Sequence, residues 1–209
     1  MLATLAREGI DVSRVLRGKE PTGVAAISVG ADGQNTIIVA PGANAEVLPS
    51  HVDAAREAVM GADAVLLQLE LPMPTAVRAA GLASELGTTV VLNAAPMPEV
   101  KLPMELLAAA DVLIVNEGEA ARLAGAGSPE DVAGRVLRMG PRMVVITMGE
   151  RGAWYAFKEH KGHIPAFPVE AVDTVGAGDA FAGTLAVRWV EHQVAAALDS
   201  MGVMDAVCW

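Results

Sequence analysis

Short runs of uninterrupted apolar residues recur through the middle of the sequence, and segments of helical character follow them. Strands that are buried on both faces of a parallel sheet are apolar throughout, whereas half-exposed strands alternate apolar and polar residues. This pattern predicts an α/β fold in which helices cover both faces of a mostly parallel, Rossmann-type sheet. The expected strands are 64–69, 89–92, 112–115 and 143–147, and the expected helices are 54–60, 75–86, 104–109, 117–124, 130–139 and about 178–198.

Two pairs of β segments interrupt this alternation. The first pair, 24–29 and 35–40, is separated by Asp32-Gly33, which is a typical hairpin turn. We expect this hairpin to stand off the sheet as a small flap. The second pair is expected near 153–157 and 163–169.

The composition excludes several classes of protein. With 15 basic and 25 acidic residues, the net charge of -10 argues against a nucleic-acid partner, since phosphate backbones require basic patches. The apolar runs are far shorter than the roughly 20 residues of a membrane span, and residues 1–10 lack the features of a signal peptide. The single cysteine, Cys208, excludes an internal disulfide, which fits a reducing compartment, so we expect the protein in the cytoplasm.

The run Asp173-Thr174-Val175-Gly176-Ala177-Gly178-Asp179 follows a β segment and opens the last predicted helix. Its three small residues would let backbone N–H groups approach an anion at a helix N-terminus. Asp179, in the first turn, could accept a proton from an attacking hydroxyl. The alternative is a glycine-rich turn in which Asp179 only complements the helix dipole. A P-loop is absent, and Phe181 replaces the third glycine of a dinucleotide-binding fingerprint.

Polar residues follow three of the predicted strands. Asn116 and Glu119, after 112–115, could organise hydrated Mg²⁺ and phosphate oxygens, or could form a helix N-cap with its capping-box glutamate. The segment 147–152 could let the backbone reach a nucleotide, or could be a plain turn. Glu70 could accept hydrogen bonds from sugar hydroxyls, or could be a solvated loop residue.

Together these segments resemble the ribokinase or PfkB family of carbohydrate kinases, and the likeness covers roughly residues 1–187. The 173–179 run matches the second signature of that family, and Phe181 and Gly183 continue it. Within the family, Gln68-Leu69-Glu70 and Pro41-Gly42-Ala43-Asn44-Ala45 look most like ribokinases. The other matching blocks are Thr22-Gly23-Val24-Ala25, Leu92-Asn93-Ala94-Ala95-Pro96, Asn116-Glu117-Gly118-Glu119 and Thr147-Met148-Gly149.

The resemblance implies ATP-dependent phosphorylation of a sugar hydroxyl, with D-ribose converted to D-ribose 5-phosphate. It implies Asp179 as the catalytic base, which also contacts the sugar, and Glu70 as a sugar ligand. The remaining implied roles are an anion hole at Gly176, Ala177 and Gly178, an ATP site at Asn116, Thr147, Gly149, Gly152 and Gly178, Mg²⁺ held through water by Glu119, and an activating K⁺ near Asp173 and Val175.

The resemblance also implies a division of the chain into parts. Residues 20–42 would contribute a β lid that closes over the sugar and, in ribokinases, pairs subunits into a homodimer. Residues 43–187 would form the nucleotide-binding core, and 188–209 a divergent tail. The whole chain, 1–209, would then be one incomplete kinase domain.

The departures from the family pattern concern both ends. Family members begin with a strand that carries a sugar-binding aspartate and then a Gly-Gly motif, which this sequence lacks. After about Val187 the likeness fades. We therefore expect a chain truncated at both ends with weakened sugar affinity. The alternatives to an active ribokinase are an inactive remnant that only binds nucleotide, or a related kinase for fructose, a keto-deoxy sugar acid or a nucleoside.

Loss of the first strands would leave a sheet edge unpaired and apolar surface uncovered, which favours aggregation. We therefore expect this chain alone to be poorly soluble or to require a partner segment. Size-exclusion chromatography and thermal unfolding test this expectation. A sharp melt from a well-behaved monomer would contradict it.

Overall fold

The computed structural model describes residues 1–29, 35–170 and 174–194. Its main sheet has six strands in the order β3-β4-β5-β6-β7-β8, which is also their order along the chain. The first four strands are parallel, and β7 and β8 are antiparallel to their neighbours. The strands are β3 (Ala64–Leu67), β4 (Thr89–Asn93), β5 (Val112–Asn116), β6 (Met143–Thr147), β7 (Ala153–Phe157) and β8 (His160–Ile164).

Several helix ends have recognisable capping chemistry. At the start of α7, the Ser128 side chain accepts a hydrogen bond from the N–H of Asp131 at 3.1 Å. At the end of α4, Gly87 adopts the left-handed conformation with φ +75°, as is common for a helix-terminating glycine. The helices are α1 (Leu2–Arg7), α2 (Pro49–Ala54), α3 (Arg56–Met60), α4 (Met73–Leu86), α5 (Met104–Ala109), α6 (Glu117–Ala124), α7 (Pro129–Leu137) and α8 (Ala177–Val194), with short 3-10 turns η1 (Ala43–Glu46) and η2 (Gly149–Arg151).

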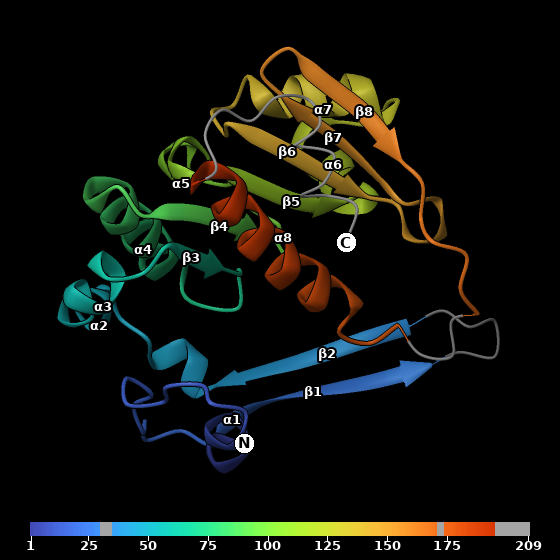
Figure 1. Cartoon of the computed structure of the whole chain (residues 1–209). Coiled ribbons are helices and arrows are strands. Elements are labelled where there is room, and N and C mark those ends of the chain that lie inside the picture. Colours follow the sequence, from blue (N-terminus) through green and yellow to red (C-terminus); the bar gives the residue numbers. More distant parts are fainter. Residues whose placement is uncertain (30–34, 171–173, 195–209) are drawn as a thin grey trace.

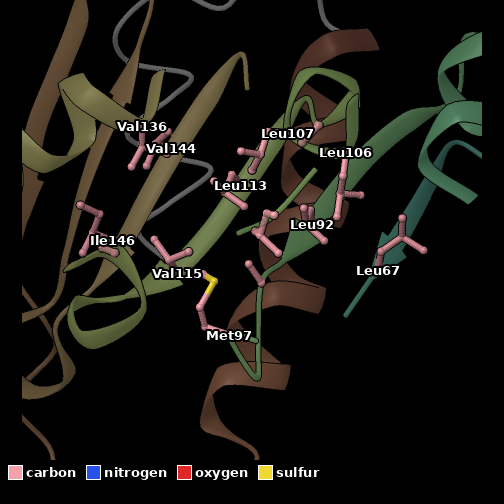
Figure 2. Close-up of a cluster of buried hydrophobic side chains, with 14 of the residues drawn as sticks. Leu67, Leu92, Met97, Leu106, Leu107, Leu113, Val115, Val136, Val144 and Ile146 are labelled. Atoms are coloured by element: carbon pink, nitrogen blue, oxygen red, sulfur yellow. The ribbon is translucent and has the colours of Figure 1, made fainter. Parts of the chain in front are cut away.

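Helices cover both faces of the sheet, as the sequence predicts (Figure 1). Crossovers between neighbouring parallel strands are right-handed, so strands that follow one another in a single direction place their helices on one face. That face packs against α4, α5, α6 and α7, and Figure 2 shows Leu92, Leu113 and Val144 from adjacent strands in its core. Among the described residues, α8 alone covers the opposite face.

The first two strands form a separate antiparallel hairpin of β1 (Thr22–Val29) and β2 (Asn35–Gly42). It stands apart from the main sheet (Figure 1), and this confirms the predicted flap. The predicted turn at Asp32-Gly33 lies outside the described residues. Val24 and Ile38 are exposed, which is expected for a two-stranded sheet that has no layer packed on it.

Three predicted elements have clearly different boundaries. The predicted strand 64–69 ends at Leu67. The predicted helix 54–60 begins earlier, at Pro49, because proline favours the first helical turn, and it is interrupted at Ala55. The last strand is His160–Ile164 and not 163–169, because its register against β7 begins at Phe157–His160. The end of the predicted helix 178–198 lies outside the described residues beyond 194. No described helix is long and apolar enough to span a membrane.

Trp189 anchors α8 to the sheet. Its side chain is fully buried, and its ring meets Phe157 of β7 edge to face at 5.3 Å between centroids. Leu185 and Ala182, one and two turns earlier on α8, lie in the same buried cluster. The apolar face of this helix therefore fixes the position of its N-terminal turn.

Trp189→Ala should lower the free energy of unfolding by about 3–5 kcal/mol, because it removes a large side chain from a closed core. Denaturant unfolding followed by circular dichroism measures this loss. Val187→Ala is a matched control on the same helix, since Val187 is 58% exposed. An equal loss in both variants would show that α8 is not anchored through Trp189.

Candidate active site

The carboxyl ends of the parallel strands bring polar residues to one edge of the sheet. Asn116 and Thr147 end β5 and β6 and are register partners. Gln68 follows the last residue of β3, and the buried Asn93 ends β4. Ligands of open α/β sheets bind at this edge, because the loops and helix N-termini that follow the strands converge there.

The N-terminal turn of α8 carries the predicted anion hole and leaves open space beside its backbone. Gly176 has φ +77°, a conformation that favours glycine, and its carbonyl accepts the N–H of Ala180 at 2.9 Å. The first N–H groups of a helix have no acceptor within the helix and carry partial positive charge. A Cβ added at Gly178 would meet no atom within 4 Å, so the space beside this backbone is open. The Ala177 N–H donates to the Thr174 carbonyl at 3.2 Å, and the N–H groups of Gly176 and Gly178 have no acceptor among the described residues. The anion hole at 176–178 stays a prediction.

Asp179 lies in the first turn of α8 and is exposed. Its Oδ1 accepts a hydrogen bond from Nε2 of Gln68 at 2.7 Å, across 111 positions of sequence. Among the described residues, no hydrogen bond reaches Oδ2 of Asp179. The carboxylate is therefore held on one side and remains accessible on the other.

A cavity of about 520 Å³ lies between the β6–β7 loop and the start of α8. Five of its lining residues were predicted site residues that lie far apart in the sequence. They are Thr147, Gly149, Gly152, Ala177 and Gly178. Most of the remaining wall is apolar and comes from Ile164, Pro165, Phe167 and Phe181.

The loop that forms one wall of this cavity requires glycine. Gly152 has φ +87°, and a Cβ there would collide with the carbonyl oxygen of Ile164. Gly149 has φ +59° with open space beside it. A hydrogen bond of 2.8 Å from Met148 N–H to the Gly152 carbonyl closes the turn. The segment 147–152 is therefore a turn, as one prediction had it, and it also lines a cavity.

Asn116 and Glu119 form a reciprocal capping box at the start of α6. The Asn116 side chain accepts the Glu119 N–H at 2.8 Å, and the Glu119 carboxylate accepts the Asn116 N–H at 2.8 Å. Neither side chain lines the cavity described above. Burial raises the pKa of the Glu119 carboxyl, and the Asn116 N–H and the charge of Arg122 oppose that rise. The predicted N-cap is confirmed.

The residues at this edge are compatible with Mg²⁺ bound chiefly by water and phosphate. Among the described residues, no group of three or more His, Cys, Asp or Glu side chains could enclose a metal ion. Mg²⁺ in nucleotide sites commonly uses one or two carboxylates together with phosphates and water. One oxygen of Glu119 accepts the Asn116 N–H, and the second oxygen has no hydrogen bond within the described part of the chain. A single water-mediated carboxylate therefore fits this role.

The loop after β6 is tied to the start of α6 by charge. Arg151 of η2 forms an ion pair with Glu117, the first residue of α6. Both side chains are largely exposed, so the pair adds little to stability. Its effect is local, since it connects the loop that lines the cavity to the helix that begins at Asn116.

The other predicted site residues that the structure describes do not line the cavity. Glu70 is exposed, three residues beyond the end of β3, and does not line the cavity. Val175 is exposed beside the anion loop, whereas Asp173 lies outside the described residues. Gln68 was not predicted to act in the site, although its Gln68-Leu69-Glu70 block stood out in the sequence. The apolar wall from Phe167 and Phe181 was also missed, because isolated aromatic residues carry no site signal.

Comparison with known proteins identifies the family. The sequence matches the pfkB family of carbohydrate kinases over residues 1–202. It is 41% identical to the ribokinase of Staphylococcus aureus over 190 residues, which is 88% of this chain and 62% of that protein. It is also 36% identical to the deoxyribokinase of Salmonella typhimurium over 177 residues, covering 81% of this chain and 57% of that protein. The chain belongs to the pfkB family of carbohydrate kinases.

Solved structures of ribokinases share the fold of this chain. The structure of Arabidopsis thaliana ribokinase complexed with ribose and ATP matches with a TM-score of 0.77 at 30% identity, over 90% of this chain and 61% of that one. The predicted ribokinase-like α/β fold is therefore confirmed. The chain spans about three fifths of the length of these relatives.

Glu119→Gln should change stability in a pH-dependent way. Because burial raises the folded-state pKa of Glu119 above its unfolded value, the stability tied to this carboxyl is complete below the unfolded pKa of about 4.3. That stability falls as pH rises through the folded pKa. Glutamine keeps the capping acceptor without titrating. As pH rises from the unfolded pKa to the folded pKa of Glu119, the Tm of the variant minus the Tm of the parent chain should therefore increase. Above the folded pKa this difference should stay level. A difference that is independent of pH would contradict the prediction.

Proposed function

We propose that this chain provides the phosphoryl-transfer site of a sugar kinase that converts D-ribose and ATP to D-ribose 5-phosphate and ADP. The observation that carries the proposal is the joint position of Asp179, the open 176–178 backbone and the cavity at the start of α8. A base, an anion hole and a nucleotide-sized cavity are the parts that phosphoryl transfer to a hydroxyl requires.

In the proposed reaction, the 5-hydroxyl oxygen of ribose attacks the γ-phosphorus of ATP. The bond from that phosphorus to the β,γ-bridging oxygen breaks, and ADP leaves with the bonding electron pair. Asp179 accepts the hydroxyl proton, for which its Oδ2 has no competing hydrogen bond among the described residues. The backbone of 176–178 stabilises the charge on the phosphoryl oxygens, since it is aligned before the reaction begins. The N–H groups of Gly176 and Gly178 have no acceptor among the described residues, whereas the Ala177 N–H donates to the Thr174 carbonyl at 3.2 Å and would have to exchange that partner.

The cavity between the β6–β7 loop and α8 is the proposed nucleotide site. An apolar wall with Phe167 and Phe181 suits a purine base, and the glycines at 149 and 152 let the backbone approach it. Asn116 would contribute from the end of β5, next to Thr147. The Arabidopsis relative is a ribokinase complexed with ribose and ATP, which supports ATP as a ligand of this chain.

Two cations belong to the proposal. Mg²⁺ would neutralise phosphate charge when ATP is bound, held by phosphates and by Glu119 through water. An activating K⁺ is proposed beside Val175, together with Asp173. The magnesium proposal depends on the second carboxylate oxygen of Glu119. This oxygen accepts no hydrogen bond from the described residues.

Glu70 is the proposed sugar ligand of this chain. It lies two residues after Gln68 in the segment that follows β3, so it shares the edge of the sheet with Asp179. The Staphylococcus aureus and Arabidopsis relatives are ribokinases, which favours ribose. The likeness to a deoxyribokinase makes a deoxyribose the second candidate substrate. The β1–β2 hairpin is the proposed lid, and its exposed Val24 and Ile38 provide apolar surface for a homodimer.

The first experiment is ADP release from Mg²⁺–ATP with D-ribose and potassium, comparing the parent chain with Asp179→Ala. Ribose-dependent release should be present in the parent chain. It should fall by at least about a hundredfold in the variant, because general-base catalysis typically contributes that much.

Parallel assays with a deoxyribose and with no sugar separate the candidates. A higher kcat/KM with the deoxyribose than with D-ribose would show that the deoxyribose is the preferred substrate. Absence of release from folded, soluble chain would reject the kinase proposal and favour a chain that only binds nucleotide. Equal release from Asp179→Ala would reject Asp179 as the base.

A further inference from the structure

The hydrogen bond between Gln68 and Asp179 joins the end of a strand to the first turn of a distant helix. Nε2 of Gln68 lies 2.7 Å from Oδ1 of Asp179. Gln68 directly follows β3, and Asp179 is the third residue of α8. In the described part of the chain, it is the only side-chain hydrogen bond that Asp179 makes.

The chemistry of the two groups defines which way the bond runs. An ionised carboxylate has no proton to donate, so the amide must present its NH₂ group to Asp179. An amide carries no net charge and does not take up a proton at neutral pH. Gln68 can therefore orient the carboxylate without competing for the proton that Asp179 would accept.

The bond also distinguishes the two oxygens of Asp179. Oδ1 is engaged by Gln68, whereas Oδ2 makes no hydrogen bond among the described residues. A carboxylate on an exposed helix terminus would otherwise rotate about its side-chain bonds, since no packing restrains it. Fixing one oxygen restricts where the other can lie.

We infer that Gln68 is a positioning residue, which holds Asp179 so that Oδ2 is the oxygen that receives the substrate proton. The inference depends on the proposed function, because it assigns Asp179 as the base. It adds a residue to that site that does not itself contact the reacting atoms. A misplacement of about 1 Å at a reacting group can lower a rate by about a hundredfold.

The contact can be tested without any catalysis. The chain has three glutamines, at positions 34, 68 and 193, so the side-chain NH₂ signal of Gln68 is identified in an ¹⁵N NMR spectrum by its loss in Gln68→Ala. Asp179→Ala should shift this signal and speed its exchange with water. Asp53→Ala is the matched control, because it removes another exposed carboxylate with a 2.7 Å hydrogen bond, to Arg78, away from the site. A Gln68 signal that does not respond to Asp179→Ala would overturn the inference.

The role of the contact is tested by kinetics on the same variants. Gln68→Ala should lower kcat by about tenfold to a hundredfold, the range expected for a hydrogen bond to a charged group. The KM for ATP and the Tm should stay near those of the parent chain. Gln68→Glu keeps the shape but replaces the donor by a second carboxylate, so its loss should be larger. Gln68→Asn keeps a donor and should recover part of the rate.

The outcomes separate this inference from the proposed function. An active chain in which Gln68→Ala turns over at the parent rate overturns the role of Gln68 and leaves Asp179 as the base. A loss of kcat that follows a loss of Tm in every variant shows a structural role and also overturns it. A chain with the NMR contact but without phosphoryl transfer rejects the kinase proposal, and with it any catalytic meaning of the contact.

Discussion

The packing of α8 against the second face of the sheet is the interaction on which the site depends. Trp189, Leu185 and Ala182 bury one side of this helix against β4 to β8. That contact places the N-terminal turn of α8 at the carboxyl ends of the parallel strands. Without it, Gly178 and Asp179 would be parts of an exposed helix end with no fixed relation to Gln68 or Thr147.

In the proposed site, the groups that stabilise the fold are also the groups assigned to ligands. Asn116 and Glu119 cap α6 through two reciprocal hydrogen bonds, and this leaves one Glu119 oxygen for a hydrated ion. Gly152 closes a turn that no side chain could occupy, and the same turn lines the cavity. The structural and functional interpretations of these motifs do not exclude each other, because each uses different atoms of the same residue.

Much of the fold could be predicted from the sequence because buried parallel strands are apolar throughout. The strand Met143–Thr147 and the helix Met104–Ala109 have the predicted bounds. The start of β8 at His160 could not be predicted, since it depends on the pairing of this strand with β7. The break at Ala55 has no local signal in the sequence. Of the candidate site, the anion loop and the 147–152 turn were visible as glycine patterns. The Gln68-Leu69-Glu70 block was visible too, but nothing in it indicated that Gln68 meets Asp179.

The sequence by itself determined the α/β class, the hairpin, the glycine-rich turn before Asp179 and the capping box at Asn116. Each of these follows from local chemistry: side-chain period, turn conformation or capping within four residues. Only the tertiary structure decided that Gln68 meets Asp179 and that Thr147, Gly152 and Gly178 share a cavity. The contacts that bring the start of α8 to the sheet join residues 26 to 111 positions apart. Such distances close only when the sheet register and the burial of α8 are both satisfied.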